Sequence, residues 1–330
     1  MRRIRLRAAA AACAMALCLT GTALSAAADS ASGAALSAQQ AASGAWQGDV
    51  FTFTDDMGRE VSVSDIARVA ACTGSFAEVW SLAGGELCAV TGDAYDQHGL
   101  ELDDSVANVG GIKSPSAELL IAAEPDFIIM SANTAGHVEL DSTLTQAGIA
   151  HAYFSVETFS DYMRMLRTLT LMTGRDDLYE QNGLAVEREI DKLIAEAQNQ
   201  PARRVLLIRA YSSGAKAKGA DNMTGAMLRD LGCVNIADEN PSLLEDMSLE
   251  KILEEDPEFI FVTTMGASGD DALAALEQAY TSNPAWATLS AVKAGNFVVL
   301  PKELFHLKPN ERWAESYKML YDILFGDSAA

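Results

Sequence analysis

The sequence is poor in basic residues and in paired cysteines, and each shortage excludes a class of function. It has 24 Lys and Arg against 46 Asp and Glu, for a formal net charge of −22. A surface this acidic repels nucleic acid and anionic membranes, which excludes a nucleic-acid-binding protein. No Cys-x-x-Cys pair occurs, so a zinc ribbon and a thioredoxin-type site are excluded as well.

The sequence also lacks the motifs of the common enzyme classes. It contains no Gly-x-Ser-x-Gly, no Gly-x-Gly-x-x-Gly after the first strand and no phosphate-binding P-loop. Ser75 is at a predicted strand-to-helix turn, but the sequence places no histidine or acid to activate it. We therefore predict that the protein is not an enzyme, with a hydrolase that uses Ser75 as an alternative.

The first 28 residues have the composition of an export signal. Four arginines in the first seven residues precede an apolar run at 8–19, and three alanines at 26–28 form a cleavage site. The run is too short and too rich in alanine for a good membrane span. Because residues 1–28 hold four arginines and no acid, cleavage changes the formal charge from −22 to −26. We predict an exported protein, periplasmic or associated with the cell surface.

The cysteines leave two covalent questions open. Cys18 follows a bulky leucine and Cys13 has too short an apolar segment ahead of it, so simple cleavage near Ala28 is favoured over a lipid anchor. Three cysteines remain after cleavage, an odd number that cannot form a complete disulfide framework. Cys72 and Cys88 flank strands that should be neighbours, so buried thiols are expected and one bridge is the alternative.

The sequence after the export signal alternates between strands and helices. Residues 29–49 are predicted to be a flexible leader, and residues 50–63 a β-hairpin. Short apolar runs then alternate with helices, which is typical of a parallel sheet buried on both faces. The predicted strands are Arg68–Cys72, Leu87–Thr91, Phe127–Met130, Ile149–Phe154, Arg204–Arg209, Phe259–Thr263 and Asn296–Leu300.

The alternation divides into an N-terminal lobe at 50–158 and a C-terminal lobe at 201–330. Between them, residues 159–200 are predicted to be a helical linker with one long bridging helix at 176–198. Apolar or small residues recur along this helix at intervals of three or four, which gives a single stripe. These residues are Tyr179, Gly183, Val186, Ile190, Leu193 and Ala197.

A repeated segment supports the division into two lobes. Ser116–Ile129 and Ser248–Phe261 share the same pattern: Ser-x-Glu, a short amphipathic helix, a proline between two acidic residues, and an apolar strand. The proline ends the helix and sets an extended entry to the strand. We therefore predict an α/β protein of two Rossmann-like lobes bridged by one long rigid α-helix.

At this level of detail the chain resembles the class III, or helical-backbone, substrate-binding proteins of ABC importers for iron complexes, heme and cobalamin. The resemblance covers about residues 50–325. The matching segments are Val109–Gly111, Ser116–Ile129, Leu144–Ile149, Leu169–Asp176, Met227–Ile236, Ser248–Phe261 and Asn283–Gly295.

This resemblance implies a ligand held between two lobes and a monomer that delivers it to a dimeric permease, with no cofactor of its own. It also implies that Glu118 and Glu250 dock onto arginines of the permease. Both are in the first turn of a short predicted helix, so the alternative is that they only serve the helix dipole.

Ligands of open α/β sheets lie beyond the carboxyl ends of the strands, which selects candidate binding residues. Three cations within ten residues, in the predicted loop 210–222 and just before it, suit a ligand with carboxylate, catecholate or phosphate groups. A solvated loop is the alternative, and Arg312 can instead brace the closing helix. The candidates are Ser75, Tyr95, Asn133, Arg209, Tyr211, Lys216, Lys218, Phe305, His306, Lys308 and Arg312.

A ferric siderophore is the predicted ligand, and heme or a corrinoid such as cobalamin is the alternative. The iron of a bound heme could be reached by Tyr95, His98, Tyr211 or His306. A bare zinc or manganese site needs several converging histidines and carboxylates, and nothing here has that sequence form. A bare divalent-metal binder is therefore a minor alternative.

Overall fold

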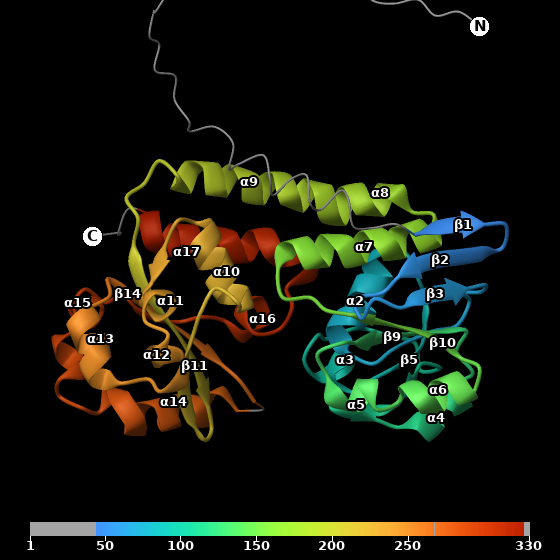
Figure 1. Cartoon of the computed structure of the whole chain (residues 1–330), viewed down its shortest axis with the longest axis horizontal. Coiled ribbons are helices and arrows are strands. Elements are labelled where there is room, and N and C mark those ends of the chain that lie inside the picture. Colours follow the sequence, from blue (N-terminus) through green and yellow to red (C-terminus); the bar gives the residue numbers. More distant parts are fainter. Residues whose placement is uncertain (1–43, 267, 327–330) are drawn as a thin grey trace, which may run out of the picture.

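The computed structural model describes residues 44–266 and 268–326. Figure 1 shows two α/β lobes side by side, with a long helical segment along one edge of both. Each lobe has its own sheet with helices packed against it. The predicted fold class, two Rossmann-like lobes bridged by a helix, is confirmed. The export signal at 1–28, with Cys13 and Cys18, lies outside the described residues.

The N-terminal lobe is built on a five-stranded parallel sheet in the order β10-β9-β4-β5-β6. Every residue of β9 is buried, as expected for a continuous apolar run in a sheet covered on both faces. The strands of this sheet are β4 (Val69–Ala71), β5 (Leu87–Val90), β6 (Ala107–Asn108), β9 (Phe127–Ser131) and β10 (Ala150–Phe154). Its helices are α2 (Gly74–Leu82), α3 (Asp93–Asp96), α4 (Ala117–Ala122), α5 (Ala135–Val138) and α6 (Asp141–Gln146).

A small antiparallel sheet precedes this lobe and begins earlier than predicted. The predicted hairpin is present as β2 (Val50–Thr54) and β3 (Glu60–Val63). A further strand, β1 (Ala45–Gln47), pairs with β2 inside the segment that we expected to be a flexible leader. Its Trp46 contacts Phe51 with ring centroids 5.5 Å apart, and its indole N–H donates to the Leu171 carbonyl at 3.2 Å. This aromatic anchor extends the folded region to Ala45.

The sheet of the C-terminal lobe has the order β12-β11-β14-β15, with β13 also paired to β11. All pairs are parallel except β11 with β12. The strands are β11 (Arg204–Tyr211), β12 (Gly214–Lys218), β13 (Val234–Asn235), β14 (Phe259–Thr264) and β15 (Phe297–Val299). The helices are α10 (Met223–Asp230), α11 (Ile236–Glu239), α12 (Ser242–Glu245), α13 (Leu249–Glu255), α14 (Gly269–Leu276), α15 (Ser290–Lys293), α16 (Lys302–Phe305) and α17 (Trp313–Phe325).

Strand β12 corrects the prediction of a loop at 210–222. The chain turns at 212–213 and pairs back on β11 as an antiparallel hairpin. The sequence of β12 is Gly-Ala-Lys-Ala-Lys, and neither alanine nor lysine favours strands, so composition gave no sign of it. Its stability comes from pairing with a buried neighbouring strand.

The repeated segment has the same backbone geometry in both lobes. The residue before each proline, Glu124 or Asp256, has a left-handed backbone with φ of 48° and 39°. After the proline, the amide N–H of Asp126 donates to the carbonyl of Arg68, and that of Glu258 donates to the carbonyl of Arg204. The two segments therefore enter their sheets through equivalent hydrogen bonds.

The long helical segment is continuous but not uniformly α-helical. It consists of α8 (Asp176–Tyr179), a π-helical turn (Glu180–Leu184) and α9 (Ala185–Ala197). In the π turn, the carbonyl of Asn182 accepts a hydrogen bond from the Tyr162 hydroxyl at 2.8 Å. The Asn182 side-chain amide donates to the Leu82 carbonyl at 2.9 Å. The predicted apolar stripe faces the interior, since Gly183, Val186, Ile190 and Ala197 are buried. The hydrogen bond from Asn182 to Leu82 fixes the π turn to the N-terminal lobe.

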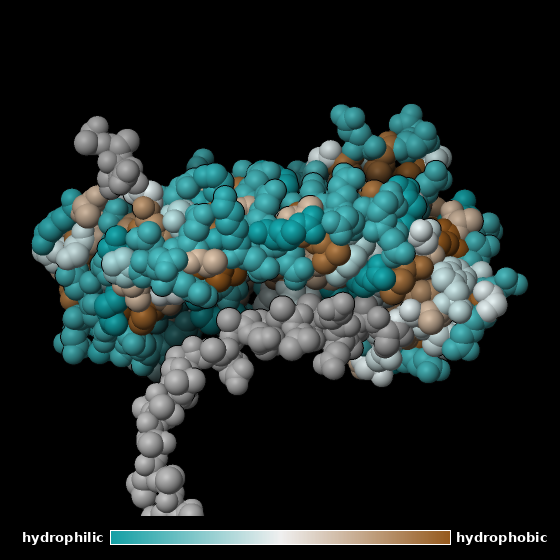
Figure 2. Space-filling model, turned by 90° about the horizontal axis from the view of Figure 1, so that it is seen from above, coloured by the Kyte–Doolittle hydropathy of each residue, from teal (hydrophilic) through white to brown (hydrophobic). Residues whose placement is uncertain are grey.

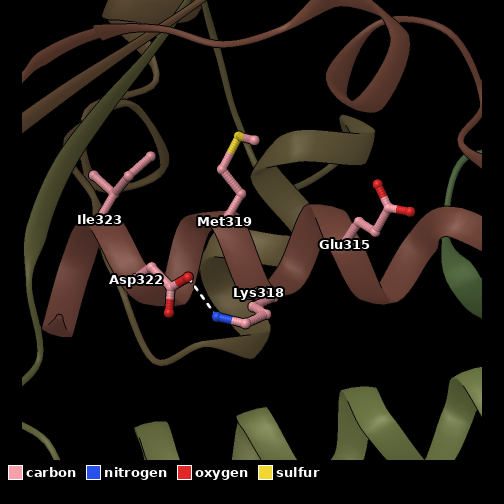
Figure 3. Close-up of a pocket in the computed structure, with 5 residues that line it drawn as sticks. All are labelled: Glu315, Lys318, Met319, Asp322 and Ile323. Carbon is pink, nitrogen blue, oxygen red and sulfur yellow. Dashed lines mark hydrogen bonds and ion pairs between the residues drawn. The ribbon is translucent and has the colours of Figure 1, made fainter.

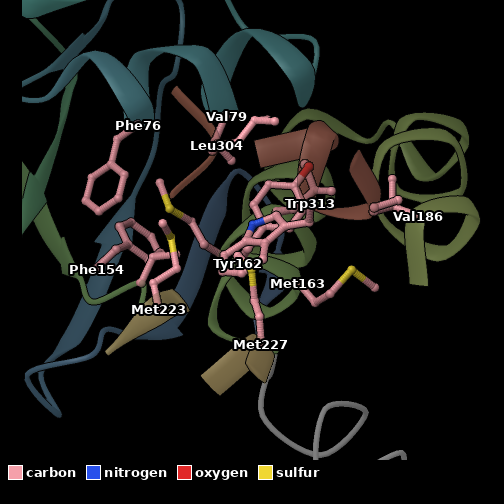
Figure 4. Close-up of a cluster of buried hydrophobic side chains, with 14 of the residues drawn as sticks. Phe76, Val79, Phe154, Tyr162, Met163, Val186, Met223, Met227, Leu304 and Trp313 are labelled. Atoms are coloured by element: carbon pink, nitrogen blue, oxygen red, sulfur yellow. The ribbon is translucent and has the colours of Figure 1, made fainter. Parts of the chain in front are cut away.

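One hydrophobic core runs beneath this helix through both lobes. Figure 4 shows Phe76, Val79 and Phe154 of the N-terminal lobe in the same cluster as Met223, Leu304 and Trp313 of the C-terminal lobe. Helix α7 (Phe159–Thr173) connects them, and the Phe159 and Trp313 rings lie 5.9 Å apart. Because this core packs buried residues of both lobes together, we expect ligand binding to cause little closure of the lobes.

The face that carries the long helix is mostly polar, and the three described thiols are unpaired. Figure 2 shows that the face that carries α9 is mostly hydrophilic. Cys72, Cys88 and Cys233 are free, so the alternative bridge between Cys72 and Cys88 is not formed. Cys72 and Cys233 are buried as predicted, whereas Cys88 is only partly buried. Burial, with a smaller effect of Asp93, raises the pKa of Cys72 to about 12, which leaves the thiol unreactive at neutral pH. Within the described ranges no helix is long and apolar enough to span a bilayer.

Candidate functional site

Charged residues of both lobes meet where the strands of the two sheets end. Glu157 follows β10 of the N-terminal lobe, and Lys308 follows α16 of the C-terminal lobe. Lys308 Nζ lies 3.3 Å from Glu157 Oε2. Asn133, which follows β9, donates from Nδ2 to Glu157 Oε1 at 3.1 Å and to Ser155 Oγ at 2.9 Å. We call this set, together with His306 and the cations of the β11–β12 hairpin, the interlobe site.

The β11–β12 hairpin presents its cations on one face. In its register Arg209 is opposite Lys216, and Leu207 is opposite Lys218. Opposite residues and residues two apart share a face of a strand pair, so all three cations lie on the Leu207 side. Tyr211 shares this side, whereas Ile208, Ala210 and Ala217 form the core on the other. Like charges directly opposite each other destabilise a strand pair, which an anion placed between them would relieve.

The charge of Arg209 on the hairpin shifts the pKa values of residues in the segment after α16. Burial, reinforced by Arg209, Lys302 and Lys308, lowers the pKa of His306 to about 4, so its imidazole is neutral at pH 7. Burial also lowers the pKa of Lys308, while Glu157 opposes this shift and Arg209 adds to it. Burial and then Arg209 lower the pKa of Lys218. Arg209 is thus a neighbour of every other cation of the site.

Most of these cations form no ion pair within the described residues. Among residues 44–266 and 268–326, none of Arg209, Lys216 and Lys218 forms an ion pair with an acidic side chain. Two nitrogens of the site, Arg209 Nε and His306 Nδ1, are buried without a hydrogen-bond partner in the same residues. Buried polar atoms are normally paired, so two unpaired nitrogens beside several cations make the interlobe site a candidate for binding an anionic group.

Several predicted site residues lie elsewhere. Phe305 is fully buried in the shared core, where its carbonyl accepts from Thr224 Oγ1 at 3.0 Å. The Tyr95 ring packs against the same core, and its hydroxyl donates to the Val106 carbonyl at 3.4 Å. Arg312 is exposed and forms an ion pair with Glu315 at 2.8 Å. It therefore braces the closing helix α17, which was the alternative to a ligand-binding role.

Ser75 lies at the contact between the two lobes. Its side chain is buried at the start of α2, 3.2 Å from Thr73 Oγ1. Its carbonyl accepts from Asn310 Nδ2 at 3.0 Å, a contact that joins the two lobes. His98, the nearby histidine considered for heme iron, pairs through Nδ1 with Glu78 at 3.2 Å. Through Asn310, which contacts both Ser75 and Glu78, this group joins the two lobes.

Sequence reasoning missed Glu157 and Ser155. Both follow β10, so the rule that selected the other candidates, the carboxyl ends of parallel strands, also applies to them. The pairing of Glu157 with Lys308 depends on how the lobes face each other, which no local pattern predicts.

Glu118 and Glu250 have matching environments on the two lobes. Both side chains are exposed in the first turn of a short helix, α4 or α13. Each helix is capped by the serine two residues earlier: Ser116 Oγ accepts from a backbone N–H at 3.3 Å, and Ser248 Oγ accepts at 3.4 Å. Leu119, beside Glu118, is 48% exposed, which gives α4 an apolar patch next to its acid.

Two hollows on the outer surface lie apart from the interlobe site. One, of about 420 Å³, is lined by residues of α17, and Figure 3 shows Met319 and Ile323 on one side of that helix and the paired Lys318 and Asp322 on another. The other, of about 380 Å³, lies between β3 and β10. Neither is lined by a predicted ligand-binding residue. In the described part of the chain, no three His, Cys, Asp or Glu side chains converge as metal ligands do.

Comparisons with known proteins agree on a family and a fold. The model of a family described as "Periplasmic binding protein" matches residues 69–304. A periplasmic heme-binding protein from Pseudomonas aeruginosa is 25% identical, with a TM-score of 0.64 over 80% of this chain and 94% of that one. SirA of Staphylococcus aureus complexed with staphyloferrin B is 16% identical, with a TM-score of 0.63 over 83% of this chain and 98% of SirA.

A third solved structure is BauB, a siderophore-binding protein bound to two molecules of acinetobactin and ferric iron. It is 17% identical, with a TM-score of 0.66 over 83% of this chain and 99% of BauB. A search of curated proteins found no match. At these identities the solved structures establish the fold.

Proposed function

This chain belongs to the periplasmic binding protein family, and from that premise we propose that it captures an iron complex between its lobes and delivers it to an ABC permease. The family and the similar structures are binding proteins. A ferric siderophore with anionic groups is the ligand that the site suits best.

The observation that carries this proposal is the set of uncompensated cations. Arg209, Lys216 and Lys218 share one face of a hairpin and form no ion pair with an acidic side chain in the described residues; Asp221 acts on Lys218 only as a nearby charge. Carboxylate and catecholate oxygens accept strong, charge-assisted hydrogen bonds from such groups, arginine most of all. The iron complexes of siderophores with these oxygens are polyanions, so charge complementarity selects them over neutral chelates.

Heme is the second candidate, and one observation favours it. His306 is neutral at pH 7, and its buried Nδ1 has no hydrogen-bond partner among the described residues. A neutral imidazole is a good axial ligand for heme iron, and the cations could hold the propionates. A corrinoid and a bare divalent metal ion remain alternatives without an observation of this kind.

A ligand panel tests the proposal. The purified protein would be titrated with a ferric tris-catecholate, a neutral ferric tris-hydroxamate, hemin, cyanocobalamin and Zn²⁺, with tryptophan fluorescence and visible absorbance as readouts. We expect the ferric tris-catecholate to bind most tightly. Tightest binding of hemin with a shifted Soret band would favour the second candidate, and binding of Zn²⁺ alone would overturn the chelate proposal.

The remaining elements of the proposal concern delivery. Glu118 and Glu250 would dock onto the permease dimer, one from each lobe of a monomeric binding protein. We place the lobes at 50–158 and 201–330, with the N-terminal lobe extended to include β1, and the linker at 159–200. Residues 1–28 would direct export and be cleaved without a lipid anchor on Cys13 or Cys18, which leaves the mature protein outside the cytoplasm.

A further inference from the structure

Glu157 is held in place from the N-terminal lobe and points its charge at the C-terminal lobe. Asn133 Nδ2 donates to its Oε1 at 3.1 Å, and its Oε2 lies 3.3 Å from Lys308 Nζ. The Lys308 side chain is 22% exposed and that of Glu157 is 44% exposed. A mostly buried ammonium group needs a counter-charge, and Glu157 is the acid that supplies it.

The same carboxylate is the one acidic group paired with the cations of the interlobe site. In residues 44–266 and 268–326, Lys308 is the single member of the site that forms an ion pair with an acid. Arg209 lowers the pKa of both Lys308 and His306, so the cation that Glu157 neutralises belongs to the same positive field as the unpaired ones. An anionic ligand entering this field meets Glu157 as a competitor.

We propose that Glu157 is a built-in competitor for the ligand: it occupies Lys308 in the free protein and is displaced when an anionic chelate binds. This inference rests on the proposed function, because it needs a ligand whose anionic groups reach Lys308. It makes Glu157 a residue that determines specificity. A polyanion gains contacts with the other cations and displaces the carboxylate, whereas a weakly charged molecule does not gain enough to do so.

The consequence is that loss of the Glu157 charge should tighten the binding of anionic ligands. The Glu157→Gln variant keeps a hydrogen-bond acceptor for Asn133 but frees Lys308. The displacement of a partly exposed ion pair is a modest cost, so we expect the dissociation constant of an anionic chelate to fall about three- to tenfold. A neutral chelate, which does not need Lys308, should show no such gain.

The test compares wild type, Glu157→Gln and Glu139→Gln. Glu139 is an acid of the same lobe, at the end of α5, and its replacement changes the net charge equally. Each protein would be titrated with a ferric tris-catecholate and a neutral ferric tris-hydroxamate, after its melting temperature has shown that it is folded. The expected result is tighter binding of the catecholate by Glu157→Gln alone. Glu139→Gln should bind the catecholate as wild type does, and the affinity for the hydroxamate should be the same in all three proteins.

Two results would overturn the inference. Wild-type affinity or weaker binding of the catecholate by Glu157→Gln would show that Glu157 does not compete. An equal gain for both chelates would show that the substitution acts through lobe geometry and not through charge. If wild type binds neither chelate, the proposed function fails together with the inference. That outcome differs from the two results above, in which wild type binds and only the role of Glu157 is wrong.

Discussion

Replacement of both Glu118 and Glu250 by alanine is expected to abolish stimulation of the permease ATPase and to leave ligand affinity within about twofold of wild type. Both carboxylates lie at equivalent helix starts on separate lobes. Truncation of one member of a close interfacial charge pair costs about 2–5 kcal/mol, so the loss of both pairs should weaken docking by more than about 100-fold. The interlobe site is untouched by these substitutions.

The matched control is the double replacement of Glu139 and Glu245 by alanine. These acids also lie one on each lobe, and their replacement gives the same change in charge. ATPase activity of the reconstituted transporter would be measured with ligand-loaded protein at low and physiological salt. Normal stimulation by the Glu118/Glu250 variant, or equal loss in the control, would show that docking does not depend on these two residues.

Replacement of Trp313 by alanine is expected to lower the free energy of unfolding by about 3–5 kcal/mol, the usual cost of deleting a buried large aromatic side chain. Trp313 is 1% exposed and lies in the shared core, 5.9 Å from the Phe159 ring. Its indole N–H has no hydrogen-bond partner in the described residues, so the loss is one of packing. Urea denaturation followed by circular dichroism would measure it.

The Trp46→Ala variant is the control for this measurement. Trp46 is 42% exposed and lies on the edge strand of the small sheet, where it contacts Phe51 and Leu171, so its loss should cost about 1 kcal/mol. Because the core of Trp313 belongs to both lobes, we also expect the weakened protein to unfold in a single transition. Two separate transitions in wild type would show that the lobes are independent and that the core does not hold them together.

Features of the fold that depend on residues close together in the sequence could be predicted from sequence patterns. The stripe of the bridging helix and the alternation of apolar strands were visible because burial on one or both faces leaves a period in the sequence. The repeated Glu-helix-Pro-strand segment was visible because a capping serine at the helix start and a proline after the helix end recur at the same spacing in both lobes. These features are set within a few residues of each other.

Long-range features could not be predicted in this way. Strand β12 is stabilised by its neighbour β11 and not by its own alanines and lysines. The π turn contains Asn182, whose hydrogen bonds go to Tyr162 and Leu82, two residues distant in sequence that no local pattern links to it. Phe305 was predicted to face a ligand, yet it ends a short helix whose apolar side faces the shared core. Glu157 was missed because its partner Lys308 is on the other lobe.

The most direct test of the account is calorimetric titration of a ferric tris-catecholate into wild type, Arg209→Ala and Arg229→Ala. Arg209 adjoins the other cations of the interlobe site, whereas Arg229 is an arginine on α10 that is paired with Asp230. Loss of a charge-assisted contact should weaken one-to-one binding by more than about tenfold in Arg209→Ala, and Arg229→Ala should bind as wild type does. Wild-type affinity in Arg209→Ala would contradict the assignment of the interlobe site as the place where this protein holds its ligand.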